Sequence, residues 1–148
     1  MNKTLTRYLD TTEYISKLRE IPETELNEPI KPDKWSIKQI VFHMYYWDRL
    51  ILNDCVPAMS ESKLPAFPDH DMHNKKGMSH INDFSTGEVL DIFIDMRQAV
   101  CDALLEIDDD TRFTIGSGKR RFSRDSFVKM FIEHDRHHLE QIDEKLNG

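Results

Sequence analysis

A chain of 148 residues is long enough for one hydrophobic core, and its 39% hydrophobic and 32% charged residues are typical of a single globular domain, which we expect to span residues 1–148. The formal net charge of −7 argues against nucleic acid and anionic membrane surfaces as partners, because both bind clusters of Lys and Arg. No apolar run approaches the length of a membrane span and the first residues lack the apolar core of a secretory signal, so we expect a cytoplasmic protein.

The first predicted helix covers 3–20, where apolar side chains recur at the spacing of one helical face. Pro22 follows it and ends the pattern, because proline has no backbone N–H with which to continue a helix. The second predicted helix covers 36–54 and begins at a capping box, in which Ser36 and Gln39 satisfy each other's free backbone amides. Each of these helices has one apolar face that must be buried.

The third predicted helix covers 85–107 and begins at a second capping box, formed by Ser85 and Glu88. The fourth covers 123–146, with Ser123 as the expected N-cap. Almost no segment of the chain has the alternating pattern of a strand. Four amphipathic helices without strands predict an all-α protein with the architecture of a four-helix bundle.

The lengths of the connections predict the topology of the bundle. Helices one and two, and helices three and four, are joined by short links, whereas 55–84 separates helices two and three. This link of roughly 30 residues can run back along a helix, which at 18 residues is about 27 Å long. We therefore predict a long crossover with helices two and three parallel. The stretch 111–122 is expected to be a small hairpin or an irregular loop.

Three histidines lie on or beside the apolar faces of two predicted helices. His43 lies within the core-facing stripe of the second helix, and His134 and His138, four residues apart, lie at the edge of that of the fourth. Three imidazoles directed into one bundle are unfavourable unless something binds them, and a shared divalent cation would do so. Spacing alone leaves the alternatives open, which are a hydrogen-bonded core histidine and a chance pair.

Polar residues near these histidines are candidates to orient them. Asp135 lies inside the apolar arc of the fourth helix, so its carboxylate needs a partner, whereas His137 points toward solvent. Gln141 shares a face with His138 and either orients that ring or is solvated. Asp48 is the third candidate, although it lies rather far round its own helix to reach the histidine there.

Two further clusters have weaker signals. The segment "DHDMH" (69–73) is a conceivable loop metal site, but a solvated crossover that partly covers the bundle end is the simpler reading, because its spacing fits no ligand pattern. The basic cluster before the fourth helix either attracts a carboxylate-bearing thiol cosubstrate or forms a charged hairpin. It consists of Lys119, Arg120, Arg121 and Arg124.

The cysteines and two tyrosines are assigned structural roles. Cys55 and Cys101 are expected to be helix residues, because no basic neighbour lowers the pKa of either thiol, and they form no disulfide framework. Tyr45 and Tyr46 face away from His43 and are expected on the surface or in a dimer contact.

Two segments resemble those of a known family. "WSIKQIVFHMYYWDRL" (35–50) resembles the Trp-Ser-x-x-[Glu/Gln]-x-x-x-His segment of the DinB/YfiT-like superfamily, and "HDRHHLEQI" (134–142) resembles its His-[Asp/Asn]-x-x-His-x-x-Gln-[Ile/Leu] segment. They occur in the family's order and at about its spacing, and the resemblance covers nearly the whole chain. It implies a four-helix bundle of DinB/YfiT type, often a homodimer, with one divalent metal held by three histidines.

Carried over by position, the ligands implied by the resemblance are His43, His134 and His138. His137 occupies a place that is often Tyr in relatives, which agrees with its exclusion from the ligands. Glu140 departs from the small residue often found just before the Gln, so no specific substrate is carried over. The metal is expected to be zinc or nickel. The three imidazoles alone do not determine it, because they suit several divalent ions.

Three neutral imidazoles leave a metal its full charge, so a bound water or thiol becomes acidic. Members of the superfamily include metal-dependent hydrolases and enzymes that use low-molecular-weight thiols, among them bacillithiol and mycothiol transferases and a maleylpyruvate isomerase. We therefore expect thiol-dependent S-transfer to a small-molecule substrate, with hydrolysis as the alternative and no general base assigned. A metal-containing binding or stress protein without turnover is the third reading, and a fourth side chain such as Asp135 closing the site would favour it.

Overall fold

Four long helices form the protein, as the sequence predicts, in a computed structural model that describes residues 2–148. They are α1 (Lys3–Lys17), α3 (Ile37–Leu50), α6 (Thr86–Leu105) and α7 (Arg124–Asn147). Shorter elements join them: η1 (Leu18–Glu20), α2 (Glu23–Asn27), η2 (Ile51–Cys55), α4 (Val56–Met59), β1 (Lys63–Leu64), α5 (His70–Met78), η3 (Ile81–Asp83) and β2 (Thr114–Ile115). The part of the chain that the structure describes has no helix both long and apolar enough to cross a membrane.

Local sequence signals explain where the helices begin. The side chains of Ser36 and Gln39 each accept a backbone N–H of the other residue, so the predicted capping box starts α3. Ser85 and Glu88 start α6 in the same way. The second helix does not end near residue 54 but continues through a π turn, η2, into α4 as far as Met59. These caps determine the residue at which each helix begins, and therefore which of its side chains face the core.

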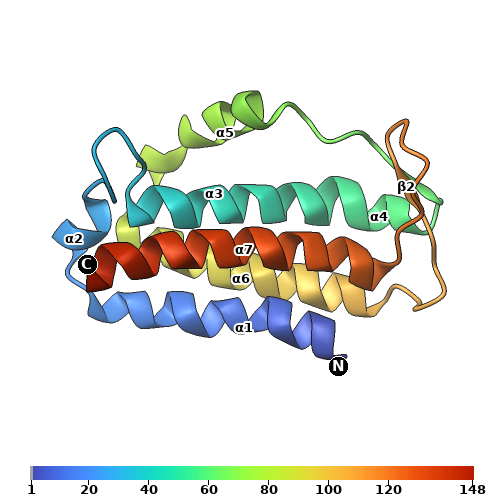
Figure 1. Ribbon diagram of the computed structural model, residues 1–148, viewed down its shortest axis with the longest axis horizontal. Helices are drawn as coiled ribbons and strands as arrows, with labels where there is room; N and C mark the ends of the chain where they lie inside the picture. The colour runs from blue at the N-terminus through green and yellow to red at the C-terminus, as the bar shows by residue number, and fades with distance from the viewer. Residues whose placement is uncertain (1) are drawn as a thin grey trace.

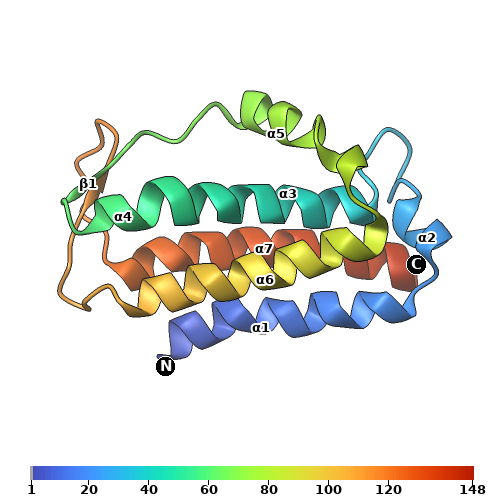
Figure 2. The same cartoon turned by 180° about the vertical axis from the view of Figure 1, so that it is seen from behind.

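The long helices have the predicted crossover topology (Figure 1). α3 and α6 run in the same direction, and α1 and α7 run in the opposite one. The chain returns from the end of α4 to the start of α6 along the outside of α3, and Figure 2 shows this crossover from behind. α6 packs closely against both α3 and α1, whereas α3 and α7 approach each other less closely. Helix α5 packs against α3.

Two short segments differ in detail from the expectation for the connections. The stretch 111–122 is a hairpin, in which Phe113 and Phe122 exchange backbone hydrogen bonds of 3.0 and 2.7 Å. Its strand β2 also pairs in parallel with β1, which the sequence did not predict. The crossover is not merely a solvated link, because its middle forms helix α5 with Asp69 as the N-cap.

A polar layer divides the core of the bundle. One apolar cluster contains Leu5, Ile51, Val100 and Phe127, and it lies toward the start of α1. The other cluster, at the opposite end of the four helices, includes Ile15, Ile40, Val89 and Ile142. Between these clusters, each long helix carries buried polar side chains, namely Thr11, His43, Asp48, Arg97, Asp135 and His138. The functional candidates therefore sit at the middle of the bundle.

Candidate metal centre

The structure brings together the three histidines singled out from the sequence. α3 supplies His43, and α7 supplies His134 and His138 from successive turns. One ring nitrogen of each lies within 4.8 Å of the corresponding atoms of the other two. The ring centroids of His43 lie 5.4 Å from His134 and 4.8 Å from His138. We call this group the candidate metal centre.

The spacing of the three nitrogen atoms fits a single cation. Three atoms that are no more than 4.8 Å apart all lie within about 2.8 Å of a common point. Histidine nitrogens bind zinc at about 2.0–2.1 Å, so each imidazole needs to move by less than about 1 Å to reach a shared ion. Among the described residues, no other group of His, Cys, Asp or Glu side chains gathers in this way.

The imidazoles of the candidate metal centre are neutral at physiological pH. Burial, followed by the neighbouring histidines, lowers the pKa of His43 from 6.5 to about 3. Burial also lowers the pKa of His138, to about 4, and lowers that of His134. Neutral imidazole is the form that donates a lone pair to a metal. His134 is exposed, whereas His43 and His138 are buried.

Amide oxygens orient the two buried rings. Nδ1 of His43 lies 3.0 Å from Oδ1 of Asn74, and Nδ1 of His138 lies 2.9 Å from Oε1 of Gln141. Nε2 of His138 is buried and has no hydrogen-bond partner. A cation held by the three imidazoles would give this nitrogen a partner, so the residues fit a bound metal. Gln141 therefore has the predicted contact with His138.

The carboxylates of Asp48 and Asp135 do not contact the candidate metal centre, because both bind Arg97. This guanidinium donates to Asp48 at 2.7 and 3.2 Å and to Asp135 at 2.7 and 3.1 Å. Tyr8 donates to Asp48 at 3.1 Å, and its ring centroid lies 3.8 Å from Cζ of Arg97. The expectation that Asp135 needs a partner holds, but it does not close the site as a fourth ligand. Burial raises the pKa of Asp48, and the guanidinium of Arg97 opposes this shift.

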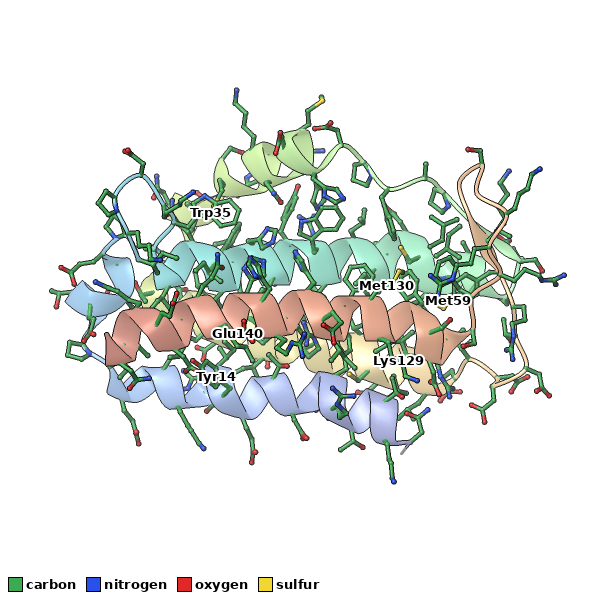
Figure 3. The ribbon with its side chains drawn as sticks, viewed as in Figure 1. Tyr14, Trp35, Met59, Lys129, Met130 and Glu140 are labelled. Atoms are coloured by element: carbon green, nitrogen blue, oxygen red, sulfur yellow. The ribbon has the colours of Figure 1, made fainter. Side chains whose placement is uncertain are left out.

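The sequence did not predict two residues of the site. Arg97 lies in the apolar stripe of α6, between Phe93 and Val100. A charged residue at such a position indicates a buried ion pair, and this pattern could have identified it. Asn74 lies on the short polar helix α5, for which no periodicity pointed to the core. Trp35, from the resemblance motif, packs with its ring centroid 4.9 Å from that of His43 and lies above the N-terminal half of α3 in Figure 3.

The conceivable loop metal site at 69–73 does not form. Asp69 accepts the backbone N–H of Met72 at the start of α5. The rings of His70 and His73 pack against Trp47, with centroids 5.1 and 4.4 Å from its ring. His70 and His73 thus pack α5 against α3 and do not form a metal site.

The basic cluster divides into exposed and buried members. Lys119, Arg120 and Arg121 are exposed, as expected of a charged hairpin. Arg124 is buried and is already occupied, since it pairs with Asp109 and Asp125 and donates to a backbone carbonyl of the α6–β2 link. Arg124 is therefore not a free cationic group of this cluster, and the exposed members agree with the alternative of a charged hairpin.

The cysteines behave as predicted, but one tyrosine does not. Cys55 and Cys101 are buried, and burial raises the pKa of each thiol to about 12, so neither is a nucleophile at neutral pH. Tyr46 is not on the surface, because α5 covers it and only 8% of it is exposed. Tyr45 is half-buried against the apolar cluster around Phe42.

A cavity of about 600 Å³ lies beneath the crossover, one to two turns further along α3 than His43. Its lining includes Arg49, Leu50, Phe67, His73 and Lys76. None of the three histidines of the candidate metal centre lines it. The cavity and the candidate metal centre are therefore separate.

Comparisons with known proteins agree with this arrangement. The family model of the DinB superfamily matches residues 7–142, which includes all three histidines. No curated protein sequence matches the chain. The fold is similar to that of YfiT from Bacillus subtilis, described as "a probable metal-dependent hydrolase with an unusual four-helix bundle topology", with a TM-score of 0.67 and 15% identity over 97% of this chain and 83% of that one. The family match over most of its length shows that the chain belongs to the DinB superfamily.

Proposed function

We propose that the chain is a metal-dependent enzyme. It binds one divalent cation, zinc or nickel, through His43, His134 and His138. The observation that carries the proposal is the convergence of three neutral imidazoles, one of them with a buried and unpartnered nitrogen. Such a set leaves room for a further ligand, as catalytic three-histidine sites do. The description of YfiT as a probable metal-dependent hydrolase supports metal-dependent chemistry on this fold.

We further propose S-transfer from a low-molecular-weight thiol to a small electrophilic substrate. When bound, the cation supplies Lewis acidity that lowers the pKa of a thiol or a water beside it. The thiol proton leaves to solvent, the sulfur forms a bond to the electrophilic carbon, and the leaving group departs with its electron pair. This reaction needs no general base from the protein, which suits a site whose two nearby buried carboxylates, Asp48 and Asp135, are both held by Arg97.

Hydrolysis at the same centre is the second candidate, and the similarity to YfiT favours it. It requires water to be deprotonated and directed, and Gln141, which contacts His138, is an amide and cannot take a proton. A role in metal binding without turnover is the third candidate. It is disfavoured by Asp135, because its carboxylate binds Arg97 and does not close the centre as a fourth ligand.

The first experiment measures metal content and reaction type. Protein purified from cytosol is subjected to elemental analysis as wild type, as His43→Ala and as His80→Ala, which removes an exposed imidazole in the crossover as a control. We expect about one zinc or nickel per chain in wild type and control, and a large loss in His43→Ala. Full metal occupancy in His43→Ala would remove His43 from the ligands and overturn the proposed site.

The loaded protein is then assayed with a chlorinated aromatic electrophile and a small thiol, and separately with ester and amide substrates. Thiol conjugation that depends on the metal supports S-transfer, whereas hydrolysis without thiol supports the second candidate. Absence of both in a fully loaded protein supports the third. The homodimer implied by the family resemblance stays a prediction, which light scattering of the purified protein tests.

A further inference from the structure

The crossover helix α5 reaches the candidate metal centre through the side chain of Asn74. Its Oδ1 atom lies 3.0 Å from Nδ1 of His43 and 2.9 Å from Nε1 of Trp47, so two rings of α3 share one acceptor. Asn74 is half-buried at this contact. A single amide of the crossover is thus bonded directly to one of the proposed ligands.

The indole of Trp47 decides which way the amide of Asn74 faces. An indole nitrogen only donates a hydrogen bond, so the atom of Asn74 beside it is the carbonyl oxygen. That oxygen only accepts, so the Nδ1 atom of His43 carries a proton. In a neutral imidazole the other nitrogen, Nε2, then has the free lone pair. The hydrogen bonds select the tautomer of His43 that presents Nε2 to a cation.

Gly77 shows how closely α5 must approach α3 for this contact. A Cβ atom at position 77 would lie 2.7 Å from Cδ2 of the buried Tyr46, closer than side-chain carbons normally come. One turn earlier, His73 packs against the rings of Tyr46 and Trp47, with centroid separations of 4.6 and 4.4 Å. A side chain at position 77 therefore displaces α5 without removing any of the three hydrogen-bonding groups.

We propose that Asn74 is a positioning residue of the metal centre, which with Trp47 holds His43 in its Nδ1-protonated tautomer and couples docking of α5 to cation binding. The inference rests on the proposed function, because it requires His43 to be a ligand. By linkage, a cation at His43 stabilises the docked crossover by the same factor by which the docked crossover strengthens cation binding. The crossover is then a part of the metal centre as well as a connection.

The test measures the affinity for Zn²⁺ by competition with a chromophoric chelator, and the tautomer of His43 by ¹⁵N NMR of the metal-free protein. Asn74→Leu removes the acceptor, whereas Asn74→Asp keeps an oxygen that accepts from both rings. Gly77→Ala displaces α5 and leaves the hydrogen-bonding groups intact. Asn82→Leu, at an exposed amide of the same crossover, is the matched control.

We expect wild-type His43 to carry its proton on Nδ1, and Asn74→Leu to move protonation toward Nε2. Zn²⁺ affinity is expected to fall about 10–100-fold in Asn74→Leu, the range found when a partner of a metal-binding histidine is removed. Gly77→Ala is expected to weaken binding in the same direction. Asn74→Asp is expected to bind Zn²⁺ at least as tightly as wild type, because its carboxylate accepts from both rings and makes the imidazole more basic. Asn82→Leu is expected to bind Zn²⁺ as wild type does, and circular dichroism confirms that each variant is folded.

Wild-type affinity in folded Asn74→Leu, or protonation of Nε2 in wild-type His43, would overturn the inference. The wild-type tautomer is read without any substitution, so the inference is decided even where a variant fails to fold. Failure of the proposed function has a different signature, since wild type would then bind no Zn²⁺ although its His43 carries the proton on Nδ1.

Discussion

Arg97 of α6 binds the carboxylate of Asp135 on α7 through two parallel hydrogen bonds, of 2.7 and 3.1 Å, where both side chains are almost fully buried. The same guanidinium binds Asp48 of α3 and donates to the backbone carbonyl of Tyr8 on α1, so one residue joins all four long helices at the level of the histidines. Burial disfavours its charge, but the carboxylates hold the pKa of Arg97 above its ordinary value. A fixed polar layer of this kind sets the spacing of α3 and α7, and with it the spacing of the candidate ligands.

Replacing Arg97 by Met is expected to destabilise the fold by about 3–5 kcal/mol, because two buried carboxylates lose their only cationic partner. Urea unfolding followed by circular dichroism measures the change. Arg136→Met is the control, since its pair with Glu133 is exposed and is expected to contribute less than about 1 kcal/mol. Equal effects of the two substitutions would show that the polar layer does not hold the bundle together.

The stability of the metal-free protein is expected to fall as the pH is lowered from about 6.5 toward 4. The pKa of His43 is about 3 and that of His138 about 4 in the folded protein, against 6.5 for an unperturbed imidazole. Below pH 6.5 the unfolded chain therefore binds more protons than the folded one, so stability rises with pH in this window. The loss at pH 4 is expected to be on the order of a few kcal/mol.

Urea midpoints measured in the presence of a chelator at several pH values test this dependence. The double variant His43→Gln with His138→Gln cannot titrate at these positions, and its midpoint is expected to vary less with pH. His80→Gln, at an exposed imidazole, is expected to retain the wild-type dependence. A double variant as sensitive to pH as wild type would contradict the assignment of the effect to these two rings.

Gln141 is expected to strengthen cation binding through its hydrogen bond of 2.9 Å to Nδ1 of His138. Removal of this acceptor in Gln141→Leu is expected to weaken Zn²⁺ binding about tenfold, at the lower end of the range for such partners, because the residue is only half-buried. Chelator competition measures it, with Glu140→Gln on the adjacent exposed position of α7 as the control (Figure 3). An unchanged affinity in Gln141→Leu would mean that solvent replaces the amide at no cost.

Both cysteines are expected to be inert toward a disulfide reagent in the native protein at pH 8. Burial raises the pKa of Cys55 and of Cys101 to about 12, so almost no thiolate is present. Two thiols per chain are expected to react after unfolding in guanidinium chloride. Rapid native reaction of either thiol would contradict this, and it would reopen a cysteine nucleophile as part of the mechanism.

Local sequence patterns were sufficient for the helices and for part of the site. Ser36 with Gln39 marks the start of α3, and this start fixes the turn on which His43 faces α7. The apolar arcs of α3 and α7 then bring His43, His134 and His138 onto facing surfaces, and the family resemblance identified the same three residues. These features depend on periodicity within one helix, which is why they can be predicted from a single sequence.

The remaining contacts join elements that no local pattern relates. The need of Asp135 for a partner was evident, but the choice of Arg97 depends on how α6 and α7 pack. Asn74 lies on a helix of nine residues with mostly exposed side chains, so nothing in its own segment indicates that it contacts His43. Tyr46 appeared to face solvent for the same reason, since the helix that covers it was not predicted.

The crossover runs along the outside of the bundle, and Gly77 is the one residue of α5 that is buried. Most side chains of α5 therefore add little to the hydrophobic core of the four long helices, whereas the imidazole of His43 is bonded directly to Asn74 of α5. Substitutions in α5 are therefore expected to change the affinity of the centre for a cation more than they change the packing of the four long helices.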